Sequence, residues 1–164
     1  MARAPLGVFA CIGYDDPELL NSAAPDLAVL NNEGRVLKHG PDRIGLCGLF
    51  PAKGREAAYR AMSDSDFRVI MNHMPRLAEE SAAHGADLYL CGHTHGGQVR
   101  LPFWGAILTK SSTRKRFEAG VDRVGHTVVY TSRGLGLEPP PAPQIRFLCR
   151  PEITLITVRP TAQQ

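Results

Sequence analysis

The chain has 164 residues, 43% of them hydrophobic, and a formal net charge of +3 from 19 basic and 16 acidic residues. This length suits one domain with a buried core, so we expect residues 1–164 to form a single domain, and the small basic excess predicts no specific nucleic-acid binding. No apolar run approaches the ~20 residues of a membrane span, and the N-terminal apolar run is too short for a signal peptide, so we expect a cytoplasmic protein.

Short apolar runs alternate with helical patterns along the first hundred residues, which is typical of an α/β domain. Beyond residue 97 the pattern favours β structure. The expected strands lie in 6–13, 26–32, the two arms of a hairpin within 35–50 that turns at 39–42, 97–101, 126–132, 144–149 and 152–158. In 66–75 and 87–97 a strand runs out into a loop. The expected helices begin at Pro17, with Asp16 as its N-cap, and cover 54–63 and 76–85.

The four cysteines are widely spaced and form no CxxC pair. The spacing therefore indicates neither a disulfide framework nor a zinc ribbon. Cys11, Cys47 and Cys91 lie in apolar, strand-like runs, and we interpret them as buried free thiols.

Two of the expected strands end in histidines. His73 follows one strand in "MNHMP", and His93 and His95 follow another in "CGHTHGG". Ligands bind at the carboxyl ends of strands in open α/β sheets, and glycines let a loop bend closely around an ion. Imidazole is a common ligand of Zn, Mn, Fe and Ni, so the three histidines predict a metal site.

These segments resemble blocks of the calcineurin-like metallophosphoesterases. "DLYLCGHTHGGQVRLPFWG" resembles the last metal-binding block of that family, and "FRVIMNHMP" resembles the block before it. Together with "YTSRGLG" and "IRFLCRPEITLITV", the chain is similar to the bacterial branch that contains the YkuE and YaeI type phosphodiesterases. The resemblance implies an α/β sandwich of two β-sheets flanked by helices, and hydrolysis of phosphoesters by a metal-activated water. His73 and His93 would bind one metal ion and His95 the other.

The chain departs from the family at its N-terminus. The family begins with D-x-H and G-D-x-x-D blocks, which supply further ligands, and neither is present. The resemblance therefore implies a shortened member whose sandwich lacks the first strands. Residues 13–16, Gly-Tyr-Asp-Asp, stand where the family has G-N-H-D or G-N-H-E, so Asp15 replaces its catalytic histidine. A carboxylate there is expected to bind metal or to act as an acid or base.

Several features leave alternatives open. Arg133 and Arg100 are candidates for orienting a phosphate, and a surface salt bridge is an equal alternative for each. The apolar loop around Trp104 is either a membrane-facing patch or ordinary packing. Loss of strands would expose a sheet edge, so we expect a homo-oligomer.

Two functions remain open on the sequence. The first is a phosphoesterase that acts on phosphodiesters and depends on Mn, Zn, Fe, Ni or Co. The second is an inactive metal-binding remnant that serves as a structural or binding module.

Overall fold

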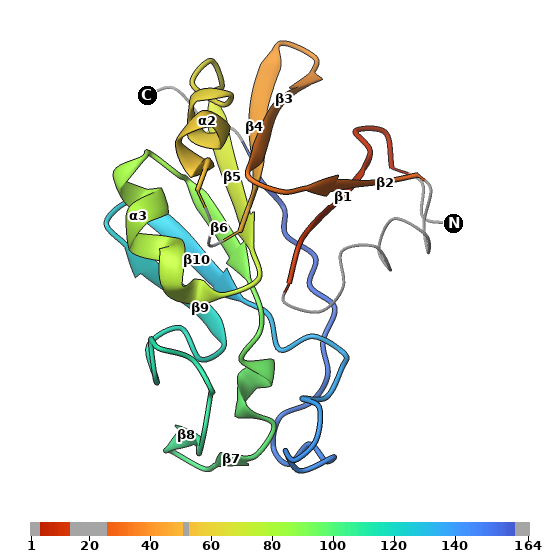
Figure 1. The fold of residues 1–164 in the computed structure, drawn as a ribbon, viewed down its shortest axis with the longest axis vertical. Coiled ribbons are helices and arrows are strands. Elements are labelled where there is room, and N and C mark those ends of the chain that lie inside the picture. The colour runs from red at the N-terminus through yellow and green to blue at the C-terminus, as the bar shows by residue number, and fades with distance from the viewer. Residues whose placement is uncertain (1–3, 14–25, 51–52, 160–164) are drawn as a thin grey trace.

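The computed structural model describes residues 4–13, 26–50 and 53–159 (Figure 1). The helix expected from Pro17 lies outside these ranges. The strands are β1 (Val8–Cys11), β2 (Leu27–Leu30), β3 (Glu33–His39), β4 (Asp42–Leu49), β5 (Phe67–Asn72), β6 (Leu88–Cys91), β7 (Arg100–Leu101), β8 (Gly105–Ala106), β9 (Gly120–Val124) and β10 (Thr127–Thr131). The helices are α2 (Arg55–Arg60) and α3 (Ala78–Ala83), with short 3-10 turns at η1 (Pro75–Leu77) and η2 (His95–Gly97).

A six-stranded mixed sheet forms the centre of the fold, in the order β3-β4-β5-β6-β10-β9. The four middle strands are parallel, whereas β3 and β9 pair antiparallel at the two edges. The β3–β4 hairpin turns over two residues between His39 and Asp42, as the sequence predicts. The carboxyl ends of neighbouring parallel strands lie at the same end of the sheet. The segments that follow β4, β5, β6 and β10 therefore all begin at this carboxyl end.

Both helices pack on one face of this sheet (Figure 1). The crossover helices lie where the βαβ connections of a parallel sheet require them. The core between the helices and the sheet is close-packed and apolar, which provides the main driving force for folding. Its fully buried members include Cys47, Leu49, Ala58, Met62, Ile70, Ala78, Tyr89 and Val129.

A second, parallel pair of strands, β1 and β2, lies beside the main sheet and contacts β4 and β5. A small antiparallel pair, β7 and β8, lies at the far end of the molecule (Figure 1). The expectation of a mixed α/β fold is therefore confirmed, with one large sheet and few helices among the described residues. None of the helices in the described ranges is long and apolar enough to cross a bilayer.

The C-terminal part of the chain differs from the sequence-based expectation. The strands expected over 144–149 and 152–158 are wrong, because these segments join no sheet beyond a single bridge between Phe147 and Val99. Ile153 and Leu155 are 85% and 92% exposed. Their apolar alternation is a genuine strand pattern, but a strand forms only where a neighbour accepts and donates its backbone hydrogen bonds. Strand β9 is not predicted by the sequence pattern, because it begins with glycine and its three middle residues, two of them charged, are exposed.

Candidate metal centre

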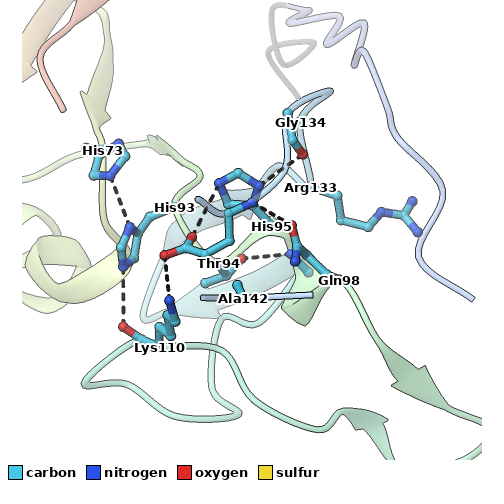
Figure 2. Close-up of polar contacts among 12 residues, drawn as sticks. His73, His93, Thr94, His95, Gln98, Lys110, Arg133, Gly134 and Ala142 are labelled. Carbon is cyan, nitrogen blue, oxygen red and sulfur yellow. Dashed lines mark hydrogen bonds and ion pairs between the residues drawn. The ribbon is translucent and has the colours of Figure 1, made fainter. Parts of the chain in front are cut away.

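His73 and His93 meet because β5 and β6 are neighbouring parallel strands. Each histidine follows its strand directly, or after one glycine, at the same edge of the sheet. His93 Nδ1 lies 3.0 Å from His73 Nε2, and the two rings are 4.8 Å apart in an edge-on arrangement (Figure 2). The loop after β5 is held by Asn72, whose buried Oδ1 accepts a hydrogen bond from the Met74 N–H. The sequence-based expectation that these strand ends converge is met for this pair.

The spacing of the two nitrogens suits ligands of one cation. With metal–nitrogen bonds of about 2.0–2.1 Å, two ligands of a tetrahedral ion lie about 3.3 Å apart, and two at right angles about 2.9 Å apart. The observed 3.0 Å falls between these values. His73 and His93 therefore fit as two members of a ligand set.

The tautomer of His93 also favours metal binding. Its Nε2 lies 3.3 Å from the backbone carbonyl oxygen of Lys110 (Figure 2). A carbonyl can only accept, so the proton of the neutral ring belongs on Nε2. The lone pair is then on Nδ1, which accepts a hydrogen bond from His73 Nε2 in this structure. An imidazole whose outer nitrogen donates to a carbonyl is the usual arrangement of a metal-binding histidine.

The loop that carries His93 and His95 has an uncommon backbone. His93, His95 and Gln98 have φ values of 68°, 49° and 54°, in the left-handed region that side chains other than glycine seldom adopt. Such strain persists only where the surrounding structure enforces it, and it gathers at functional sites. Thr94 supplies part of that support, because its buried hydroxyl donates to the carbonyl oxygen of Glu118 and accepts from the Gly96 N–H.

His95 has a different set of neighbours. Its Nδ1 lies 3.1 Å from the carbonyl oxygen of Gly136, and its Nε2 lies 3.8 Å from Oε2 of Glu138. The other oxygen of Glu138 forms a 3.0 Å ion pair with Lys110. Lys110 thus contacts both halves of the site. The Lys110 carbonyl oxygen faces His93, and the Lys110 ammonium group pairs with Glu138, the neighbour of His95.

A hollow of about 310 Å³ adjoins His95. Lys110 and Glu138 lie on its polar side, and its apolar lining includes Val99, Leu108 and Pro143. It is large enough for an organic group beside the histidine.

Asp15 lies outside the described residues, so its prediction stays a prediction. Its approach is visible, however, because β1 leads to Gly13, which lies against the ring of His73. A Cβ placed on Gly13 would be 3.1 Å from His73 Nδ1. The chain therefore passes beside His73 two residues before Asp15.

Arg133 and Arg100 each have a carboxylate partner. Arg133 donates from Nε to Glu152 at 2.6 Å, and its side chain points away from His95 (Figure 2). Burial raises the pKa of Glu152, but hydrogen bonds from Arg133 and Tyr130 outweigh it, so the pKa is below its ordinary value. Arg100 pairs with Glu118 at 2.7 Å. Arg133 and Arg100 therefore both form salt bridges in this structure. Their role in binding a phosphate stays a prediction.

Sequence patterns do not predict the place of Lys110 or Glu138 in the site. Glu138 belongs to the stretch "LEPPPAP", whose prolines indicate only a rigid surface connection. In the structure this connection folds back over the histidine loop, because Gln98 donates to the Pro143 carbonyl at 2.9 Å and accepts from the Glu138 N–H at 2.5 Å. Pairings so distant along the chain leave no local signal in the sequence.

Within the ranges that the structure covers, no group of three or more His, Cys, Asp or Glu side chains is placed so that it could hold a metal ion. The thiols do not supply the missing ligands. All four cysteines are free, and burial raises the pKa of Cys11 to about 11 and that of Cys91 to about 12. Such thiols stay protonated at neutral pH. Cys47 and Cys91 are buried, as the sequence predicts, whereas Cys11 is only partly buried.

Known proteins resemble this chain closely. A protein of Bacillus subtilis (strain 168) named "Uncharacterized metallophosphoesterase YkuE" is 39% identical over 106 residues, which cover 65% of this chain and 36% of that protein. "Phosphodiesterase YaeI" of Escherichia coli (strain K12) is 32% identical over 160 residues, which cover 90% of this chain and 57% of that protein. The chain belongs to the metallophosphoesterases. The resemblance to the metallophosphoesterases is thereby confirmed.

An "Uncharacterized metallophosphoesterase" of Aquifex aeolicus (strain VF5) is also similar to this metallophosphoesterase, with 28% identity over 94% of the chain. The chain spans between 36% and 62% of the lengths of these three relatives. No protein-family model matches it, and no solved structure does.

Proposed function

We propose that this chain is a divalent-metal-dependent phosphoesterase that hydrolyses phosphodiesters. The observation that carries the proposal is the pair of imidazole nitrogens, His73 Nε2 and His93 Nδ1, held 3.0 Å apart at the ends of two parallel strands. The printed names of the relatives, metallophosphoesterase and phosphodiesterase, support the same chemistry.

His73 and His93 would hold one cation and His95 a second. A divalent cation bound there neutralises phosphate charge and lowers the pKa of water, which makes a nucleophile available near neutral pH. Asp15 is the candidate for the remaining carboxylate, as ligand or as acid and base, because its chain passes beside His73. Manganese is the first metal to test, and Zn, Fe, Ni and Co are alternatives.

The hollow beside His95 supports a diester over a monoester. A diester carries two organic groups, so one of them must lie against the protein while the other leaves. The apolar lining by Val99, Leu108 and Pro143 suits an uncharged group, and Lys110, paired with Glu138, also lines the hollow.

The test is hydrolysis of bis(p-nitrophenyl) phosphate by the 164-residue chain, with and without Mn²⁺. We expect Mn²⁺-dependent turnover that is lost in His93→Ala and His95→Ala. His126→Ala is the matched control, because His126 is exposed in the turn before β10. Turnover that survives in His93→Ala, or that needs no metal, would contradict the proposal.

The second candidate is a catalytically inactive metal-binding module. The small number of ligands gathered within the described residues favours it. Mn²⁺ binding without hydrolysis of mono- or diesters, with the binding dependent on His93, would select this candidate over the enzyme.

We also propose that this chain is a single domain that forms a homo-oligomer in the cytoplasm. Exposed apolar side chains on an unpaired extended segment, such as Ile153 and Leu155, support association with a second copy. Phe103 and Trp104 are 111% and 66% exposed. Contact of these apolar side chains with a membrane is the alternative to association with a second copy. Light scattering that gives the monomer mass would contradict the oligomer, and binding to lipid vesicles would favour the membrane.

A further inference from the structure

Arg146 joins three segments of the site through backbone carbonyls. Its Nη1 donates to the carbonyl oxygens of His95 at 3.2 Å and Cys149 at 3.4 Å. Its Nη2 donates to those of Arg133 at 2.7 Å and Gly136 at 2.5 Å, with Gly134 at 3.3 Å. One guanidinium group thus holds together the histidine loop, the segment after β10 and the C-terminal segment.

Two of these bonds bracket His95. Arg146 holds the backbone carbonyl of His95 itself, and it also holds the Gly136 carbonyl that faces the His95 ring. Since that carbonyl can only accept, its 3.1 Å contact with His95 Nδ1 is a hydrogen bond only when Nδ1 carries the proton. The lone pair of the neutral ring then lies on Nε2.

The chemistry of the bonds requires an arginine. A planar guanidinium presents donors in a fixed fork and serves several acceptors at once, which a lysine ammonium group cannot do from one position. Among the described residues no carboxylate lies within ion-pairing distance of Arg146, unlike Arg100 and Arg133. Apart from a 3.6 Å contact with Cys149 Sγ, the two Nη groups of Arg146 donate to carbonyl groups of the site.

We propose that Arg146 is a positioning residue that fixes the orientation and the tautomer of the His95 ring. By holding Gly136 and the His95 backbone together, it keeps Nδ1 protonated and presents the lone pair of Nε2 to a cation. This inference rests on the proposed role of His95 as a metal ligand, but its effect on the ring is present without metal.

The experiment compares Arg146→Met and Arg146→Lys with the unaltered 164-residue chain. The matched control is Arg150→Met, because Arg150 lies four residues further along the same segment and is exposed. Long-range ¹H–¹⁵N NMR of the metal-free protein reports the tautomer of each histidine ring, and His95→Ala assigns the signal. Calorimetric titration with Mn²⁺ gives the dissociation constant, and circular dichroism shows that each variant is folded.

We expect His95 to be protonated on Nδ1 in the unaltered chain and in Arg150→Met, and to be a mixture of tautomers in Arg146→Met. The Mn²⁺ dissociation constant should rise about 10–100-fold in Arg146→Met, as for other outer partners of metal ligands, and less in Arg146→Lys. If Arg146→Met fails to fold, Arg146→Lys decides. An unchanged tautomer and an unchanged dissociation constant would overturn the proposal. Unchanged Mn²⁺ binding in His95→Ala would instead refute the metal role of His95, while the tautomer still tests Arg146.

Discussion

Replacement of Gly96 by alanine tests how tightly the histidine loop is packed. Gly96 has a φ of 62°, and a Cβ placed on it would lie 2.6 Å from Cγ of Arg133 and 2.7 Å from Sγ of Cys149. Ordinary contacts between such atoms are about 3.5–4.0 Å, so one of these groups must move. Cys149 is 1% exposed, and Arg133 is tied to Glu152, so neither moves freely.

Gly134 provides the matched control. Its φ of 61° is nearly the same as that of Gly96, but a Cβ on it would meet nothing within 4 Å. Alanine in the left-handed region costs about 1–2 kcal/mol at either position. Overpacking adds about 1–3 kcal/mol at Gly96 alone. Gly96→Ala should therefore lower the free energy of unfolding by about 1–3 kcal/mol more than Gly134→Ala.

Equilibrium unfolding in urea, followed by circular dichroism, measures both free energies. Addition of Cys149→Ala to Gly96→Ala should recover part of the loss, because it removes the Sγ contact. Equal losses in Gly96→Ala and Gly134→Ala would refute the reasoning, since they would show that the loop yields to the extra methyl group at no cost.

Two further changes test side-chain interactions within the fold. Glu80 accepts hydrogen bonds from Arg55, which lowers its pKa below the ordinary value of 4.5. The stabilisation by the Arg55–Glu80 ion pair is therefore complete at pH values above 4.5. It is lost as the pH falls through the lower pKa that Glu80 has in the folded protein. Urea midpoints should separate the unaltered chain from Glu80→Gln above about pH 5 and converge in acid, and a constant difference would contradict this assignment. Thr127→Val removes a buried 2.6 Å hydrogen bond to the carbonyl of Ala86 with little change of shape, and should cost about 1–3 kcal/mol in urea unfolding, whereas no loss would show that this carbonyl finds another donor.

Local sequence pattern is sufficient to predict the α/β order and the strand ends that carry His73 and His93. The order of the strands and the positions of their ends can be predicted because each strand is an apolar run of strand length bounded by glycine and polar residues. Parallel strands joined by helices bring their carboxyl ends together, so the meeting of the two histidines can be expected from the order of the segments. The buried state of Cys47 and Cys91 follows from the same apolar runs.

The surroundings of His95, in contrast, depend on the tertiary structure. Gly136, Glu138 and Arg146 lie 41 to 51 residues further along the chain, and their contacts depend on how a proline-rich connection folds back. Long-range packing also leaves residues 152–158 outside every sheet, because strand formation needs a partner as well as an apolar alternation. Local pattern is encoded in neighbouring residues, whereas these contacts arise between segments that no short window of sequence contains together.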